Sequence, residues 1–127
     1  MTVGSEGLMI AVIFEVWPAQ GCKDDYLGIA AALRADLDRI DGFISIERFQ
    51  SLSDPQKLLS LSFWRDEDAA KNWRNHSKHR ESQTKGRSGI FADYRLRVAA
   101  VARDYGLTAH AEVPEDSRGL HDERQSR

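Results

Sequence analysis

The sequence predicts one α+β domain in which six segments follow one another as strand, helix, strand, strand, helix and strand. Residues 8–17 and 57–64 are apolar on both alternating faces, which is typical of strands that are covered on both sides. Residues 21–40 and 66–87 have the spacing and the end signals of helices. A length of 127 residues allows a single core.

The charge balance makes nucleic acid and anionic membranes poor partners, because both favour a clearly basic face. The formal net charge is −2, so we expect a small-molecule ligand. Cys22 is the sole cysteine; we expect an inert thiol in a reducing cytoplasm. Residues 1–7 are small and polar, so we expect a mobile lead-in and no signal peptide. The longest apolar run, residues 8–17, is far shorter than the roughly 20 residues of a membrane span.

The first strand and the first helix have clear ends. Pro18 ends the strand of residues 8–17, since proline cannot donate to a strand ladder. Asp24 and Asp25 suit the start of a helix over residues 21–40, and Asp41-Gly42 supplies its stop. The apolar stripe of this helix contains Tyr26, Ile29, Ala30, Leu33, Leu37 and Ile40.

The next two strands form a predicted hairpin. Residues 43–51 alternate less cleanly, as an edge strand does, whereas residues 57–64 are of the buried type. Ser53-Asp54-Pro55 makes the turn between them.

Asp66 is the predicted N-cap of the second helix, which places Ala69, Trp73, His76 and Arg80 on one stripe. We expect this helix to loosen around His76 and Ser77 and to end by Gly86.

Residues 90–104 are the longest strand candidate. Tyr94, Leu96 and Val98 fall on a face that we expect to meet the core, while the alternate residues face a cavity rim, solvent or a second subunit. Residues 106–127 are too polar to fold alone and are expected to be disordered, which leaves a domain over residues 8–105.

This order of elements is the ferredoxin-like βαββαβ plan. It places the first and third strands centrally in a four-stranded antiparallel sheet, with both helices on one face. The other face would leave apolar side chains uncovered, so we expect two sheets to pack face to face in a homodimeric α+β barrel.

Trp73 and His76 are the candidate functional pair, because their spacing puts them on one flank of the second helix. Core packing and ligand stacking are both open for Trp73. His76 is open between a structural histidine and a pocket donor or base. A metal is not expected, since the pair formed with His79 lacks further ligands at metal-site spacing. His110 and His121 lie in the tail.

The basic residues on and after the second helix, namely Arg74, Lys78, Arg80, Lys85 and Arg87, predict a solvated face. Arg95 makes ion pairs on the last strand or rims a pocket and holds an anionic oxygen. No phosphate loop, nucleophile elbow or dinucleotide fingerprint is present in the sequence, so no cofactor is expected.

Three stretches together resemble the antibiotic biosynthesis monooxygenase domain: SFW at residues 62–64, RDEDAAKNWRNHSKHR at 65–80 and IFADYRLRV at 90–98. The likeness covers residues 9–105. It implies a dimeric α+β barrel. It also implies one of three roles: cofactor-independent oxidation of phenolic, anthrone or hydroquinone substrates by dioxygen, haem degradation, or no established activity.

The resemblance carries over residue by residue. Trp73 matches the tryptophan that lines the family's active cavity. The quinone-forming branch has Asn four positions earlier, where this chain has Ala69. The haem-degrading branch has an Asn on the first strand, where this chain has Phe14 and Glu15. It also has a haem-ligating His after the tryptophan, and the matching position in this chain is near Gln83.

The resulting hypothesis is a cofactor-independent monooxygenase with Trp73 as cavity wall and His76 as base or donor. Tyr26, Phe14, Trp64 and Arg95 are the expected substrate-binding residues. Two alternatives stay open: a non-catalytic homodimer that binds a small ligand, and a protein that binds or degrades haem.

Overall fold

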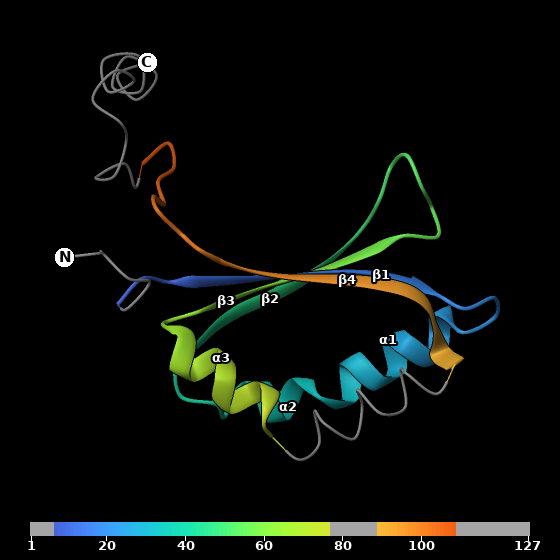
Figure 1. The fold of residues 1–127 in the computed structure, drawn as a ribbon, viewed down its shortest axis with the longest axis horizontal. Helices are drawn as coiled ribbons and strands as arrows, with labels where there is room; N and C mark the ends of the chain where they lie inside the picture. Colours follow the sequence, from blue (N-terminus) through green and yellow to red (C-terminus); the bar gives the residue numbers. More distant parts are fainter. Residues whose placement is uncertain (1–6, 77–88, 109–127) are drawn as a thin grey trace.

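A computed structural model describes residues 7–76 and 89–108. Its elements are β1 (Ile10–Pro18), α1 (Lys23–Ala32), α2 (Arg34–Leu37), β2 (Phe43–Gln50), β3 (Leu58–Trp64), α3 (Glu67–Arg74) and β4 (Phe91–Ala100). The sheet forms one layer and the helices lie against one of its faces (Figure 1). This is the predicted ferredoxin-like α+β arrangement.

The strand order in the sheet is β2-β3-β1-β4, and every neighbouring pair is antiparallel. The first and third strands are therefore central, as the sequence predicted, and the strand of residues 43–51 is an edge strand. The β1–β3 register runs from Ile10 opposite Trp64 to Val16 opposite Leu58. All four of these side chains are buried and face the helices.

The first helical region is split, whereas one helix over residues 21–40 was predicted. α1 ends at Ala32, and α2 forms a separate short helix after Leu33. The Leu33 N–H donates both to Ile29 O, at 3.2 Å, and to Ala30 O, at 3.3 Å. Such shared bonds are common at helix ends, and here they mark the break. Spacing of apolar residues alone does not reveal this break, since the stripe continues through it.

The predicted N-cap of the second helix is confirmed. The Asp66 carboxylate accepts a hydrogen bond of 2.9 Å from Ala69 N, and α3 follows directly. α3 ends at Arg74 with Asn75 as its C-cap, close to the predicted loosening. The continuation to Gly86 lies outside the described residues, as do Lys78, His79, Arg80, Gln83, Lys85, Arg87, His110 and His121. The predictions for the first six residues and for most of the tail likewise fall outside them.

β4 differs from the prediction in length and in burial. It spans ten residues instead of residues 90–104. Tyr94, Leu96 and Val98 were expected to meet the core, yet they are 50%, 49% and 49% exposed. β4 is the outer neighbour of β1 at the edge of the sheet, so its helix-facing side chains are covered from one side only.

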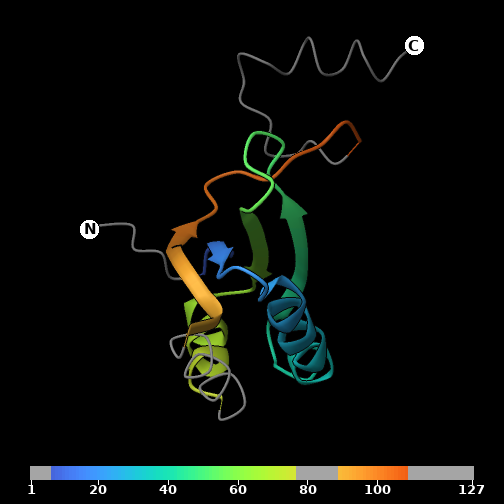
Figure 2. The same ribbon diagram turned by 90° about the vertical axis from the view of Figure 1, so that its right-hand side faces the viewer.

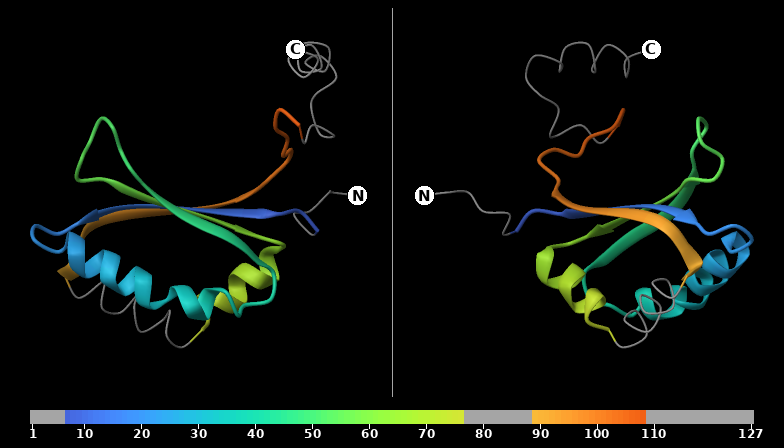
Figure 3. Two further views of the ribbon diagram at one scale, coloured as in Figure 1. Left: turned by 180° about the vertical axis from the view of Figure 1, so that it is seen from behind. Right: turned by 45° about the vertical axis from the view of Figure 1, so that its right-hand side comes forward.

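The opposite face of the sheet carries no helix of the described chain, as the end-on and rear views make clear (Figures 2 and 3). We call it the open face. Its apolar side chains alternate with the helix-facing ones and include Ala11, Ile13, Phe49, Leu59, Leu61 and Phe63. None of the helices in the described ranges has the length and apolarity needed to cross a membrane.

Candidate functional site

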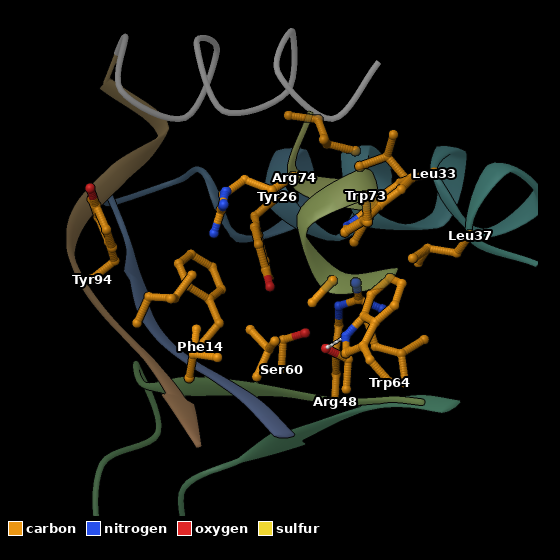
Figure 4. Close-up of a pocket in the computed structure, with 18 of the residues that line it drawn as sticks. Phe14, Tyr26, Leu33, Leu37, Arg48, Ser60, Trp64, Trp73, Arg74 and Tyr94 are labelled. Carbon is orange, nitrogen blue, oxygen red and sulfur yellow. Dashed lines mark hydrogen bonds between the residues drawn. The ribbon is translucent and has the colours of Figure 1, made fainter. Parts of the chain in front are cut away.

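A cavity of about 330 Å³ lies between the helix-facing side of the sheet and the helices. Side chains from all four strands and from α1, α2 and α3 line it (Figure 4). Most of the lining is apolar, with a small number of polar groups, which is typical of small-molecule sites. An open cavity therefore lies beside Trp73, and the core is not completely filled at this position.

Trp73 and Trp64 form one wall of the cavity. Their rings stack with centroids 6.4 Å apart, and both side chains also belong to the buried core. The Trp64 indole N–H donates to Ser62 Oγ at 2.9 Å, which holds this ring in place. Trp73 therefore has both of the roles left open by the sequence: its side chain packs in the core, and it also lines the cavity.

His76 lies directly behind this wall. Its ring stacks on Trp73 with centroids 5.5 Å apart. The imidazole Nδ1 is buried and has no hydrogen-bond partner in the described part of the chain. His76 does not line the cavity, so the structure brings the candidate pair together but places only Trp73 at the cavity surface.

The opposite end of the cavity is an aromatic cluster from α1, β1 and β4. The ring centroid of Phe14 lies 5.8 Å from those of both Phe91 and Tyr94, and the Tyr26 ring meets the Phe91 ring edge to face with centroids 5.7 Å apart. Tyr26 is only 7% exposed. Phe14, Tyr26 and Trp64, three of the four proposed substrate-binding residues, therefore line one cavity.

The sheet side of the cavity carries polar groups that the sequence reasoning missed: Arg48, Ser60 and Ser62. Ser60 is flanked in register by Arg48 on β2 and by Phe14 on β1. The alternation of side chains along β3 could have identified the two serines, because Ser60 and Ser62 share a strand face with Leu58 and Trp64. Which residues of β2 join that face depends on the irregularity between Phe43 and Ser45, and this shift is not visible in the sequence.

Glu67 and Arg74 from α3 also line the cavity and were not singled out as site residues. They place one acid and one base on the helix side, across from the polar groups of the sheet. The lining therefore offers ring surfaces for stacking, hydroxyls for hydrogen bonding and charged groups for orienting a ligand.

Arg95, the fourth proposed substrate-binding residue, does not line the cavity. It alternates with Tyr94 and Leu96, whose side chains do, so it belongs to the open face. On that face Glu15 forms ion pairs with Lys57 and Arg97. Its hydrogen bond to Lys57, followed by that to Arg97, holds the pKa of Glu15 below its usual range.

Ala69 does not line the cavity but belongs to the buried core cluster that contains Trp73. Ala69 is 1% exposed, and a Cβ atom added to Gly42 would lie 2.6 Å from the Cβ atom of Ala69. The position at which the resemblance implies Asn in the quinone-forming branch is therefore part of a close contact with the turn before β2. Of the two first-strand positions compared with the haem-degrading branch, Phe14 lines the cavity and Glu15 is ion-paired on the open face.

No group of three or more His, Cys, Asp or Glu side chains in residues 7–76 and 89–108 is arranged to hold a metal ion. His76 is the one histidine within those ranges.

The family model for antibiotic biosynthesis monooxygenase matches residues 9–85. A protein of the fungus Pyricularia oryzae, named jasmonate monooxygenase ABM, is 52% identical over 93 residues, which cover 73% of this chain. The match spans 43% of that relative's length. YqjZ from Bacillus subtilis is 34% identical over 62 residues, which cover 49% of this chain and 53% of YqjZ.

Solved structures share the fold at low sequence identity. SnoaB, a cofactor-independent oxygenase from Streptomyces nogalater solved as an asparagine-to-alanine variant, superposes with a TM-score of 0.66 at 12% identity. The match covers 76% of this chain and 95% of SnoaB. Rv0793 from Mycobacterium tuberculosis superposes with a TM-score of 0.69 at 15% identity, over 77% of this chain and 99% of Rv0793.

Proposed function

Because this chain belongs to the antibiotic biosynthesis monooxygenase family, we propose that it is a cofactor-independent monooxygenase that oxidises a small, largely apolar molecule with dioxygen. The observation that carries the proposal is the cavity between Trp73, Trp64 and the Phe14–Tyr26 cluster. A site that is mostly apolar strengthens electrostatic interactions and limits side reactions with water.

The proposed substrate class is an electron-rich phenol, anthrone or hydroquinone. Removing a proton from such a molecule gives an enolate or phenolate that passes electrons directly to dioxygen. When an anthrone methylene becomes a carbonyl, one oxygen atom enters the product and the other leaves as water with the two methylene hydrogens. The substrate supplies all the electrons, so the reaction balances without a bound redox group.

We assign stacking contacts to Trp73, Trp64 and Phe14, and a hydrogen bond to the Tyr26 hydroxyl. His76 is the proposed proton acceptor, supported by its buried Nδ1 next to Trp73, which has no hydrogen-bond partner among the described residues. His76 does not line the cavity, so proton transfer to it requires the Trp73 ring or the His76 side chain to move, and its role is tested separately from that of Trp73. We assign no substrate contact to Arg95.

A jasmonate is a second candidate substrate, favoured by the 52% identity with the relative of that name. Hydroxylation of a saturated carbon consumes two electrons beyond those of the C–H bond. A test with jasmonate therefore needs an added two-electron donor such as ascorbate.

The test is oxygen uptake by the full chain with a panel of anthrones and hydroquinones, and with jasmonate plus ascorbate. Labelled dioxygen and mass spectrometry then identify the oxygenated product. We expect turnover with at least one panel member. His76→Ala should lower kcat roughly 100-fold, the loss typical of a missing general base, and Trp73→Ala should chiefly raise KM.

Trp17→Phe is the matched control, because Trp17 lies outside the cavity lining and donates to Asp54 at 3.0 Å. It should keep wild-type rates. Absence of turnover across the panel would contradict the proposal and favour the non-catalytic ligand-binding alternative, which the packing of Ala69 against Gly42 also supports. A Soret shift on titration with haem would instead favour the haem-binding alternative.

We also propose that the active assembly is a homodimer formed through the open face. The apolar side chains of that face support this, since Phe49 is 42% exposed and Ile13, Leu59, Leu61 and Phe63 are only partly covered. A cytoplasmic location is a further proposal, resting on Cys22 as the sole cysteine.

A further inference from the structure

Arg48 is the cavity group whose position packing does not explain. It extends from edge strand β2 on the helix-facing side, next to Trp64 and Ser60 (Figure 4). Its guanidinium Nε is buried and has no hydrogen-bond partner in residues 7–76 and 89–108. No ion pair joins Arg48 to any acidic side chain in those ranges.

Arg48 as a whole is only half-buried, but its Nε is shielded from water without a hydrogen-bond partner among the described residues, and burying a polar donor in this way is costly. Three other arginines are paired: Arg65 binds both Asp41 and Asp66, Arg97 binds Glu15, and Arg34 binds Asp38. Arg48 instead lines a cavity of about 330 Å³. The missing partner is therefore best sought in the ligand.

The surroundings of Arg48 favour a carboxylate. Ser60 lies opposite Arg48 in the strand register, is 8% exposed, and its hydroxyl makes no hydrogen bond to the described residues. The neighbouring Ser62 hydroxyl already accepts from Trp64. The Arg48 guanidinium and the Ser60 hydroxyl thus offer donors on one side of the cavity, and arginine binds a planar carboxylate through two parallel hydrogen bonds.

We propose that Arg48, assisted by Ser60, binds the carboxylate of an acidic substrate and orients its apolar body against Trp73, Trp64 and the Phe14–Tyr26 cluster. The cavity then prefers small monocarboxylic acids to their neutral esters. The inference deepens the proposed function by naming a specificity residue, and it rests on that function for the reaction that follows binding. Arg48 is a binding residue here and takes no part in proton transfer.

The experiment measures binding under anaerobic conditions, so that turnover does not contribute. The probes are jasmonic acid with methyl jasmonate, and 1-naphthylacetic acid with its methyl ester. Isothermal titration calorimetry at pH 7 gives the Kd for each member of both pairs. Because hydrogen bonds to a charged group are strong, we expect each acid to bind wild-type protein roughly tenfold or more tightly than its ester.

Arg48→Gln should abolish the preference for the acid while leaving the ester affinity within about twofold, and Arg48→Lys should retain part of it, since lysine keeps the charge but loses the planar fork. Ser60→Ala should weaken binding of the acid alone. Arg39→Gln is the control, because Arg39 is exposed in the turn after α2 and lies outside the cavity lining. Thermal unfolding of each variant identifies any loss of folding.

Equal binding of acid and ester by the wild type, binding of neither at millimolar concentration, or an acid preference that persists in Arg48→Gln would overturn the inference. Failure of the proposed function is distinguishable. An acid preference that depends on Arg48, without oxygen uptake, would remove the monooxygenase proposal alone. Turnover of neutral phenols without any acid preference would remove the role of Arg48 alone.

Discussion

Gly42 lies at a junction that no other residue type can occupy without strain. Its φ is +87°, and its carbonyl accepts a hydrogen bond of 2.7 Å from Arg65 N. The Arg65 guanidinium above it binds Asp41 through two hydrogen bonds of 3.1 Å. These contacts join the turn before β2 to the start of α3, and so hold the helix that carries Trp73 and is followed by His76.

Gly42→Ala is expected to destabilise the fold by about 1–3 kcal/mol, because an L-residue is disfavoured at this φ and its Cβ would lie 2.6 Å from Ala69 Cβ. Chemical denaturation followed by circular dichroism measures the change. Gly28→Ala is the matched control: it lies inside α1 with open space around it, so alanine should stabilise the helix by roughly 0.5–1 kcal/mol. Equal effects of the two substitutions would contradict this account.

At the scale of single elements, α3 is short and polar, with only Ala69 and Trp73 buried. Helices of eight residues are marginal by themselves, so α3 depends on its cap and on the packing of these two side chains. Asp66 has two partners that favour its charged form. The hydrogen bond from Arg65, and next the one from the Ala69 N–H, hold the pKa of Asp66 below its usual range.

The lowered pKa makes the contribution of Asp66 depend on pH. A carboxylate with a depressed pKa in the folded state stabilises the fold above its unfolded pKa of about 3.9, and this stabilisation disappears as the pH falls through the folded value. Asp66→Asn keeps a capping oxygen but does not titrate. We therefore expect wild-type protein to have the higher Tm at pH 6, and the difference to shrink towards pH 2.5.

Asp66→Ala should lower the Tm at pH 6 more than Asp66→Asn, since alanine offers no capping acceptor. Thermal unfolding followed by circular dichroism at several pH values measures both effects. A wild-type advantage over Asp66→Asn that stays constant down to pH 2.5 would rule out the titration of Asp66 as its cause.

At the scale of the whole molecule, the sheet separates two environments. The helix-facing side holds the core and the cavity, and the open face combines an apolar patch with the Glu15, Lys57 and Arg97 ion pairs. Leu61 lies on β3 opposite Ile13 of β1, within that patch. A second copy of the sheet would cover it from the side that the helices leave free.

Light scattering should therefore give the full chain a mass of twice 14.4 kDa at micromolar concentration. Leu61→Arg is expected to produce the single-chain mass, because it places a charge in the proposed contact. Leu52→Arg should leave the mass unchanged, since Leu52 is 103% exposed in the turn between β2 and β3. A wild-type mass equal to that of one chain would contradict the homodimer proposal.

Local sequence patterns were enough to predict the order of strands and helical regions, the central position of the two apolar strands, the Asp66 cap and the family, because each of these depends on periodicity or on residues close together in the chain. Which side chains share the cavity could be read only from the folded chain. It joined Trp73 to Phe14, Tyr26 and Trp64, placed His76 behind the wall, and left Arg95 on the open face. Arg48 could not be found beforehand, because its place in the site depends on the β2–β3 register and on the lack of an acidic partner among residues 7–76 and 89–108, and both arise from contacts between segments distant in sequence.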